Sequence, residues 1–313
     1  MTTFENDVLE GLSSNPKFLS SRYFYDEAGD KLFQKIMDLE EYYLTDAEYE
    51  ILERHGETMV EKYLSEPFQL VELGAGDGLK TKLLFNRLFE NKIKFSYLPV
   101  DISQHALDNL WKDLAEKYPG IDGHGLKDDY FNALKRINGV NQRKVVLFLG
   151  SNIGNYTPAQ AEEFLLELRS NVSTGDKLLI GIDLKKDPDV VLKAYNDSEG
   201  VTRAFNLNLL TRINRELGGS FDLEHFEHVP EYDEASGAAR SFLRSTEDQE
   251  VRITALDASF HFSEGESIAT EISQKYSLDE VEMLADRTGF TLLENFTDSK
   301  GYFVDSIWEA KVK

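Results

Sequence analysis

The chain of 313 residues contains no cysteine, and tryptophan, methionine and proline are scarce. The absence of cysteine excludes disulfide bonds, thiolate metal sites and a cysteine nucleophile, and it fits a cytosolic protein. Long hydrophobic runs are also absent, since no stretch approaches the ~18 apolar residues that span a membrane. The acidic start, MTTFENDVLE, has no apolar signal segment. We therefore expect a cytoplasmic protein.

Basic residues are few compared with acidic ones. The chain has 34 Lys and Arg against 57 Asp and Glu, which gives a formal net charge of −23, and the acids are spread along the whole length. This charge repels nucleic-acid phosphates and anionic lipids, whereas it attracts a cationic or zwitterionic small molecule. The six histidines are scattered. We expect no nucleic-acid partner, no membrane partner and no metal site.

Short apolar runs alternate with helical patterns after a mostly helical segment of 66 residues. In that first segment we expect helices to begin at Asp30 and after a cap at Thr45. Strands separated by single helices favour a parallel sheet that is covered on both faces. The predicted strands are FQLVEL (68–73), KFSYLPV (94–100), a short segment near 125–128, KVVLFLG (144–150) and KLLIGID (177–183).

The alternating pattern is interrupted at residues 186–275, where a helix (VTRAFNLNLLTRINREL) is mixed with extended segments. A helix and a hairpin, FTLLENFTD and GYFVDSIWEA, then complete the chain. A final hairpin that closes the sheet with an antiparallel strand is typical of class I methyltransferases, whereas dinucleotide-binding domains usually continue in parallel. We therefore predict a doubly wound, Rossmann-like α/β sheet of the class I methyltransferase type, with an antiparallel last strand. Residues 47–185 and 276–313 form this domain, while residues 1–46 and 186–275 form a second lobe.

A glycine-rich turn follows the first predicted strand, in VELGAGDGLK. A dinucleotide site requires a third glycine or alanine where this chain has Leu79, because that residue packs close to the pyrophosphate turn. The glycines here are Gly74, Gly76 and Gly78, which is the E-x-G-x-G-x-G spacing of S-adenosylmethionine sites. The spacing and the final hairpin together favour S-adenosylmethionine over NAD as the cofactor.

Acidic residues end the next two strands. Asp101, in YLPVDIS, is placed to bind the ribose hydroxyls of the cofactor through charge-assisted hydrogen bonds. Its alternative role is to cap the helix that begins at Ser103. Asp129, in KDDYF, is placed to hold the adenine amino group. The combination of a glycine turn with two successive acids predicts a methyltransferase.

A set of motifs outside the sheet resembles one family, the histidine-specific methyltransferases of ergothioneine biosynthesis. The motifs are FYD…G, EYY.T.AE, ELG.G, GS.IGN, AYND..GVT..FN.N and TEIS.K, and the resemblance covers residues from about 14 to 313. It implies that S-adenosylmethionine methylates the α-amino group of L-histidine, giving trimethylhistidine, in a protein that we expect to be monomeric. It also implies that residues 1–46 and 186–275 form an amino-acid-binding lobe.

At the amine end of the substrate, the resemblance implies that Asn155 and Tyr195 hold the α-amino and carboxylate groups. Tyr25 lines the same pocket, and the amine proton leaves through water or through Tyr25. On the donor side, the residues that match cofactor-site positions are Gly74, Gly76, Lys80, Asp101, Asp129 and Tyr130.

At the imidazole end, the resemblance places Tyr42 near the ring and gives Glu271 and Ser273 hydrogen bonds to a ring nitrogen. The two residues alternate to one side of an extended segment. The chain departs from the family at Ser241, in ARSFLRS, where a bulky apolar residue is usual. A smaller polar side chain enlarges the pocket in this interpretation, so a related amino acid such as tryptophan remains an alternative substrate. A second alternative is a non-catalytic sensor of S-adenosylmethionine or an amino acid.

Overall fold

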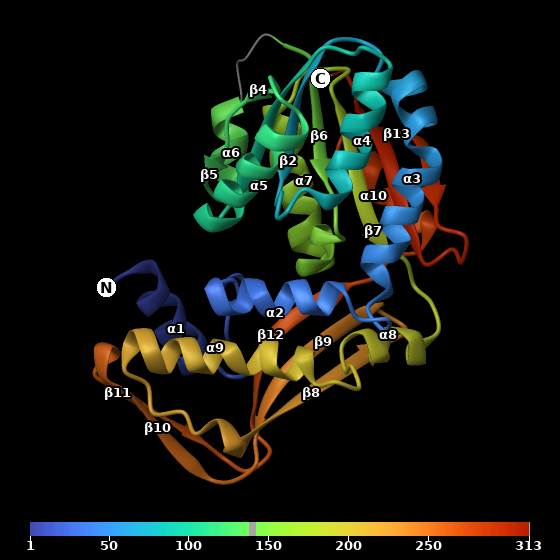
Figure 1. The fold of residues 1–313 in the computed structure, drawn as a ribbon. Coiled ribbons are helices and arrows are strands. Elements are labelled where there is room, and N and C mark those ends of the chain that lie inside the picture. The colour runs from blue at the N-terminus through green and yellow to red at the C-terminus, as the bar shows by residue number, and fades with distance from the viewer. Residues whose placement is uncertain (138–141, 313) are drawn as a thin grey trace. The chain divides into compact units, whose positions relative to one another are not determined.

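The computed structural model of the protein describes residues 1–137 and 142–312, and they divide into two compact units (Figure 1). Unit 1 contains Met1–Tyr43 and Lys186–Ser273, and unit 2 contains Leu44–Lys185 and Gln274–Lys313. Each unit therefore combines two stretches of chain that are distant in sequence. Within the described ranges, no helix has both the length and the apolar character needed to cross a membrane.

Unit 2 contains a mixed sheet with the strand order β13-β14-β7-β6-β2-β3-β4, and β5 also pairs with β3. The pairs among β2, β3, β6 and β7 are parallel, whereas β14 is antiparallel to both of its neighbours. The predicted fold class is confirmed, including the antiparallel last strand. The strands are β2 (Phe68–Leu73), β3 (Phe95–Asp101), β4 (Asp122–Gly123), β5 (Leu126–Lys127), β6 (Lys144–Phe148), β7 (Lys177–Asp183), β13 (Phe290–Thr297) and β14 (Phe303–Ala310).

Helices cover both faces of this sheet, which explains why its central strands are continuous apolar runs. On one face, Leu134, Phe164 and Leu284 of three helices join a core cluster with strand residues. On the other face, the Phe85 ring packs edge-on against Tyr97 of β3, with centroids 4.9 Å apart. The helical segments are α3 (Tyr43–Tyr63), α4 (Leu79–Glu90), α5 (Gln104–Lys117), α6 (Tyr130–Ile137), the short 3-10 helix η2 (Asn152–Asn155), α7 (Pro158–Asn171) and α10 (Leu278–Arg287).

Unit 1 is a four-stranded sheet with the order β1-β12-β9-β8, accompanied by the hairpin of β10 and β11. The two-residue strand β1 pairs in parallel with β12 and so joins the N-terminal segment to the insertion. Phe205 and Leu209 of α9 share a core cluster with Leu243 of β9. The elements are α1 (Thr3–Ser13), β1 (Lys17–Phe18), η1 (Ser21–Phe24), α2 (Glu27–Met37), α8 (Pro188–Ala194), α9 (Val201–Leu217), η3 (Leu223–His225), β8 (Phe226–Asp233), β9 (Ala238–Ser245), β10 (Gln249–Ile253), η4 (Thr254–Leu256), β11 (Ala258–Phe262) and β12 (Ser267–Gln274).

Two helices begin earlier than the sequence predicts. Helix α2 starts at Glu27 and not at Asp30, because Asp26 is its cap and accepts the Gly29 N–H at 2.8 Å. The Asp26 carboxylate also accepts from the side chain of Asn208 in α9, at 2.8 Å. Helix α3 starts at Tyr43, so that Thr45 lies inside its first turn.

Candidate active site

The predicted cofactor residues of unit 2 begin with the turn after β2. Gly74, Gly76 and Gly78 all have positive φ angles, of 77°, 52° and 64°, which favour glycine. A Cβ on Gly74 would lie 2.5 Å from the Tyr130 hydroxyl oxygen, whereas a Cβ on Gly76 would meet no atom of the described residues within 4 Å. The turn therefore presents bare backbone beside open space, which fits a ligand lying along it.

Asp101 ends β3 and is tied to the glycine turn. One carboxylate oxygen accepts the Gly76 N–H at 3.0 Å, and the other accepts the Ser103 N–H at 2.8 Å. Burial raises the pKa of Asp101, and these hydrogen bonds oppose the rise. The cap of α5 is Ser103, whose hydroxyl accepts the Ala106 N–H. Because a carboxylate accepts several hydrogen bonds, Asp101 in this position fits the predicted bond to the ribose.

Asp129 and Tyr130 begin α6, directly after β5. Asp129 is exposed, and its two oxygens accept the backbone N–H and the side-chain amide of Asn132 at 2.9 and 2.8 Å. The Tyr130 ring packs edge-on against Phe148, with centroids 5.4 Å apart, and its hydroxyl lies against Gly74. The structure thus brings the start of α6 to the glycine turn, while the adenine contact of Asp129 stays a prediction.

Lys80 lies in the first turn of α4 and forms an ion pair with Glu48 of α3. Glu48 is completely buried, and its two oxygens accept the Gly150 N–H at 2.8 and 2.9 Å. Glu48 is the last residue of the motif EYYLTDAE, but the motif alone does not indicate this role. Its contacts join α3 to the turn after β6 and to the start of α4.

Glu72, the glutamate of the glycine motif, contacts neighbouring strand and helix residues and has a structural role. It is fully buried in β2 and accepts hydrogen bonds from the hydroxyls of Thr81 and Tyr97. Burial raises the pKa of Glu72 to about 7, and the two hydroxyl bonds oppose the rise. Its carboxyl group joins β2 to β3 and α4.

Asn155 is exposed at the end of η2, in the turn after β6. Ser151 opens this turn with a φ of 55°, and its hydroxyl accepts the Asp183 N–H at 3.1 Å. A Cβ on Gly154 would lie 3.0 Å from the Gln274 carbonyl oxygen, so the turn is closely packed. Asn155 is thus held on a fixed support, and its contact with substrate stays a prediction.

In unit 1, Tyr25 and Tyr42 both pack against Phe33 of α2. The ring centroids of Tyr25 and Phe33 are 5.7 Å apart, and those of Phe33 and Tyr42 are 6.3 Å apart. Phe205 of α9 lies 5.8 Å from both Tyr25 and Phe33. The structure therefore gathers the two predicted tyrosines in one half-buried aromatic cluster. Phe33 and Phe205 were missed because their apolar periodicity indicates only core packing.

Tyr195 follows α8 and is 7% exposed. The motif AYND continues with Asp197, which accepts the N–H groups of Val201 and Thr202 at 2.8 and 2.7 Å. These two hydrogen bonds fix the turn between α8 and α9. The contact between Tyr195 and the substrate stays a prediction.

Glu271 and Ser273 lie two residues apart on β12, so they share one face of the strand. Ser241 of β9 is completely buried and donates a hydrogen bond to Glu271 Oε2 at 3.1 Å. The hydroxyl of Thr270 lies 3.0 Å from the Ser241 carbonyl oxygen and 2.8 Å from Asn206 Oδ1. Ser241 thus orients the Glu271 carboxylate, a contact that sequence alone did not reveal.

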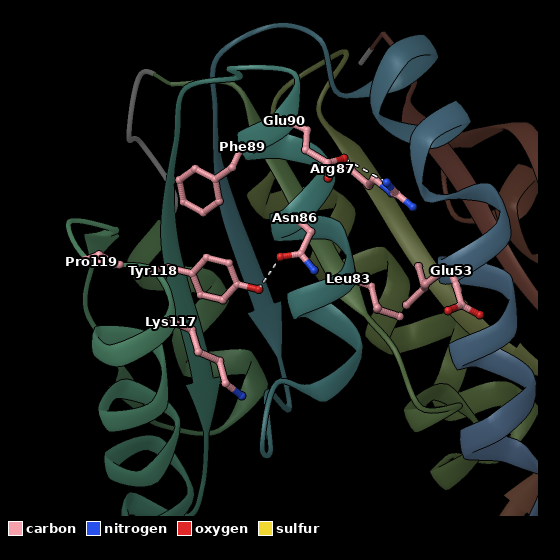
Figure 2. Close-up of a pocket in the computed structure, with 10 residues that line it drawn as sticks. Glu53, Leu83, Asn86, Arg87, Phe89, Glu90, Lys117, Tyr118 and Pro119 are labelled. Carbon is pink, nitrogen blue, oxygen red and sulfur yellow. Dashed lines mark hydrogen bonds and ion pairs between the residues drawn. The ribbon is translucent and has the colours of Figure 1, made fainter.

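The lining of a groove on unit 2 includes none of the predicted site residues. Figure 2 shows its lining residues from α3, from α4 and from the end of α5, with the Tyr118 hydroxyl 2.8 Å from Asn86 Oδ1. The predicted cofactor residues Lys80 and Asp101 instead adjoin the beginnings of α4 and α5. The groove therefore takes no part in the predicted site.

The sheet order, the glycine turn and the acid that ends β3 define a class I S-adenosylmethionine-dependent methyltransferase. The same fold occurs in the magnesium protoporphyrin IX methyltransferase of Synechocystis PCC 6803, solved with bound S-adenosylhomocysteine. The two structures superpose with a TM-score of 0.51 at 11% sequence identity, over 93% of this chain and 98% of that chain.

This chain belongs to the histidine-specific, S-adenosylmethionine-dependent methyltransferases, whose family model matches residues 4–310. It is 37% identical over 297 residues to the histidine N-alpha-methyltransferase of Mycolicibacterium smegmatis, covering 95% of this chain and 92% of that protein. Identity to the Mycobacterium tuberculosis enzyme of the same name is 36%, with the same coverage. The predictions of family, enzyme class and cofactor are confirmed.

Proposed function

We propose that this protein transfers methyl groups from S-adenosylmethionine to the α-amino nitrogen of L-histidine, forming trimethylhistidine. The observation that carries the proposal is the 37% identity to a histidine N-alpha-methyltransferase over 95% of the chain. Two features of the structure support it: an oriented Glu271 carboxylate is suited to recognise the imidazole ring, and the glycine turn is suited to bind the donor.

On the donor side, S-adenosylmethionine supplies a methyl group that its sulfonium already activates. Asp101 binds the ribose hydroxyls, and Asp129 binds the adenine amino group. Lys80 pairs with the carboxylate of the methionyl end, because that end follows the glycine turn and α4 begins there. Tyr130 closes the turn against Gly74.

At the amine end, methyl transfer by in-line displacement requires alignment and a neutral amine lone pair. Asn155 and Tyr195 orient the α-amino and carboxylate groups. The amine proton then leaves through water or through the Tyr25 hydroxyl, so that no dedicated general base is needed.

At the ring end, the Glu271 carboxylate accepts a hydrogen bond from an imidazole N–H, and Ser273 and Tyr42 complete the contacts. The hydrogen bond from Ser241 keeps the carboxylate oriented. Phenylalanine has no ring N–H and tryptophan has one on a much larger ring, so either would leave the carboxylate badly matched. This arrangement favours histidine, and a tryptophan-like substrate is the second candidate because Ser241 is small.

We also propose that the protein acts as a monomer in the cytoplasm, on a small amino acid and without a nucleic-acid or membrane partner. Its net charge of −23 supports the expected absence of nucleic-acid and anionic-membrane partners, because the charge repels phosphate backbones and anionic lipids.

The test is to incubate the purified protein with labelled S-adenosylmethionine and each of the twenty amino acids. Histidine should be methylated best, and Glu271→Ala should lower its kcat/KM about thirty- to several-hundred-fold, since a buried ring N–H loses its partner. Phenylalanine and tryptophan should lose nothing in this variant. Equal losses for all three substrates, or no histidine activity in the wild type, would contradict the proposal. Donor binding without turnover of any amino acid would instead indicate a sensor.

A further inference from the structure

A cluster of three charged side chains lies inside unit 2, beside the proposed donor site. Glu48 belongs to α3, Lys80 to the first turn of α4, and Asp305 to β14. Glu48 and Asp305 are completely buried, and the Lys80 side chain is 17% exposed. Buried charges are costly unless they are paired, so their arrangement needs an explanation.

The backbone of β7 makes room for the Glu48 carboxylate. A Cβ on Gly181 would lie 1.9 Å from Glu48 Oε1, so only a glycine admits the carboxylate at this point. Gly181 pairs in register with Asp305 on the neighbouring strand. The two carboxyl groups therefore meet over the same position of the sheet, while Glu48 also holds Lys80 and the Gly150 N–H.

Among the residues that the structure describes, no N–H or O–H group donates to the Asp305 carboxyl group, and its hydrogen-bond neighbour is Glu48. Burial and the Glu48 carboxylate raise the pKa of Asp305 well above its usual range. A protonated Asp305 donates to Glu48 and leaves one anion facing the one ammonium of Lys80, which balances the buried charge.

We propose that Glu48 and Asp305 are positioning residues that hold the Lys80 ammonium where it meets the carboxylate of bound S-adenosylmethionine. The inference rests on the proposed donor contact of Lys80. A free lysine side chain loses considerable rotamer freedom when it binds a ligand, and a lysine already held by Glu48 does not. Both carboxyl groups are completely buried, so we assign each an action through Lys80 and not a contact with the donor.

A double-mutant cycle tests this dependence, with calorimetric Kd values for S-adenosylhomocysteine, which carries the same carboxylate. Glu48→Gln should weaken binding about three- to tenfold, the range expected when one long side chain is no longer held. Lys80→Met should weaken it about ten- to hundredfold, because a charge-assisted contact is lost. The double variant should bind like Lys80→Met alone.

Asp305→Leu removes the group that donates to Glu48 and should weaken binding about three- to tenfold, as Glu48→Gln does. Asp305→Asn is the matched control, because its amide still donates to Glu48 and should restore Kd to within about twofold of the wild-type value. An unchanged Kd in Asp305→Leu, or an equal loss in both variants, would contradict the assigned role of Asp305. If Glu48→Gln does not fold, Glu48→Asp retracts the carboxylate from Lys80 and serves in the same cycle.

The cycle also separates a positioning role from a merely structural one. If losses from the two single variants multiply in the double variant, or if Glu48→Gln leaves Kd unchanged, the proposal is overturned. Wild-type protein that binds no donor would overturn both this inference and the proposed function. Donor binding without histidine methylation would contradict only the assignment of histidine as the methyl acceptor. The mutant cycle would still decide the role of Glu48.

Discussion

Replacing Ser241 by alanine should selectively weaken histidine methylation. The variant removes the hydroxyl that donates to Glu271 Oε2 at 3.1 Å, and the serine is completely buried, so water does not readily replace it. Hydrogen bonds to charged groups contribute about 1.5–3 kcal/mol. Because Glu271 is half-buried, we expect the lower end, ~1.5 kcal/mol, or about a tenfold loss in kcat/KM.

Initial rates with histidine and phenylalanine measure this effect. If Glu271 holds the ring equally in the bound state and the transition state, the loss appears as a higher KM with an unchanged kcat. Ser241→Thr keeps the hydroxyl and is the matched control, with activity close to the wild type. Ser241→Met removes the hydroxyl and fills the space, and it should narrow the substrate range.

The reasoning is refuted by an unchanged KM for histidine in Ser241→Ala, or by the same change for histidine and phenylalanine. A Ser241→Ala, Glu271→Ala double variant sharpens the result. Its kcat/KM for histidine should equal that of Glu271→Ala, because the Ser241 hydroxyl acts only through the Glu271 carboxylate.

Three further predictions concern other parts of the molecule. Asp101→Ala should weaken S-adenosylmethionine binding by ~1.5–3 kcal/mol in calorimetry, and an unchanged affinity or binding of NAD would contradict the donor assignment. Tyr195→Phe should lower the turnover of bound histidine without changing donor affinity, and an unchanged kcat would remove Tyr195 from the site. Glu72 has a folded-state pKa of about 7, raised from 4.5, so its contribution to stability is complete below about pH 4 and is lost as the pH rises through about 7. Urea unfolding measures this effect: between about pH 4 and pH 8 the free energy of unfolding should fall by up to ~3 kcal/mol less in Glu72→Gln than in the wild type. If the free energy of unfolding depends on pH in the same way in both proteins, the prediction is contradicted.

The sheet of unit 2 was predictable because its order follows from local patterns. Buried parallel strands are continuous apolar runs, and the hairpin of β13 and β14 is contained within the last residues of the chain. The start of α2 was not predictable in the same way. Its cap, Asp26, is stabilised by Asn208, which lies far away in sequence.

In the candidate site, too, some residues follow from local sequence patterns, whereas others depend on contacts between distant parts of the chain. The glycine turn and Asp101 follow from spacing along the chain, and the motifs of unit 1 follow from resemblance to a family. Glu48 and Asp305 depend on the register between β7 and β14, and on a glycine that admits a carboxylate. The sequence pattern does not indicate the contact between these two carboxyl groups, because each residue alone looks like an ordinary acidic residue.

The placement of β14 has a consequence for biosynthesis. This strand is made after β13 yet lies between β13 and β7, so β7 has an unpaired edge until residues 303–310 leave the ribosome. Leu178, Ile180 and Ile182 of β7 are all buried in the finished sheet. A nascent chain that has not yet released β14 therefore exposes an apolar strand edge, which is the kind of surface that aggregates or recruits chaperones. Translation that stops early should yield an insoluble product and not a smaller working domain.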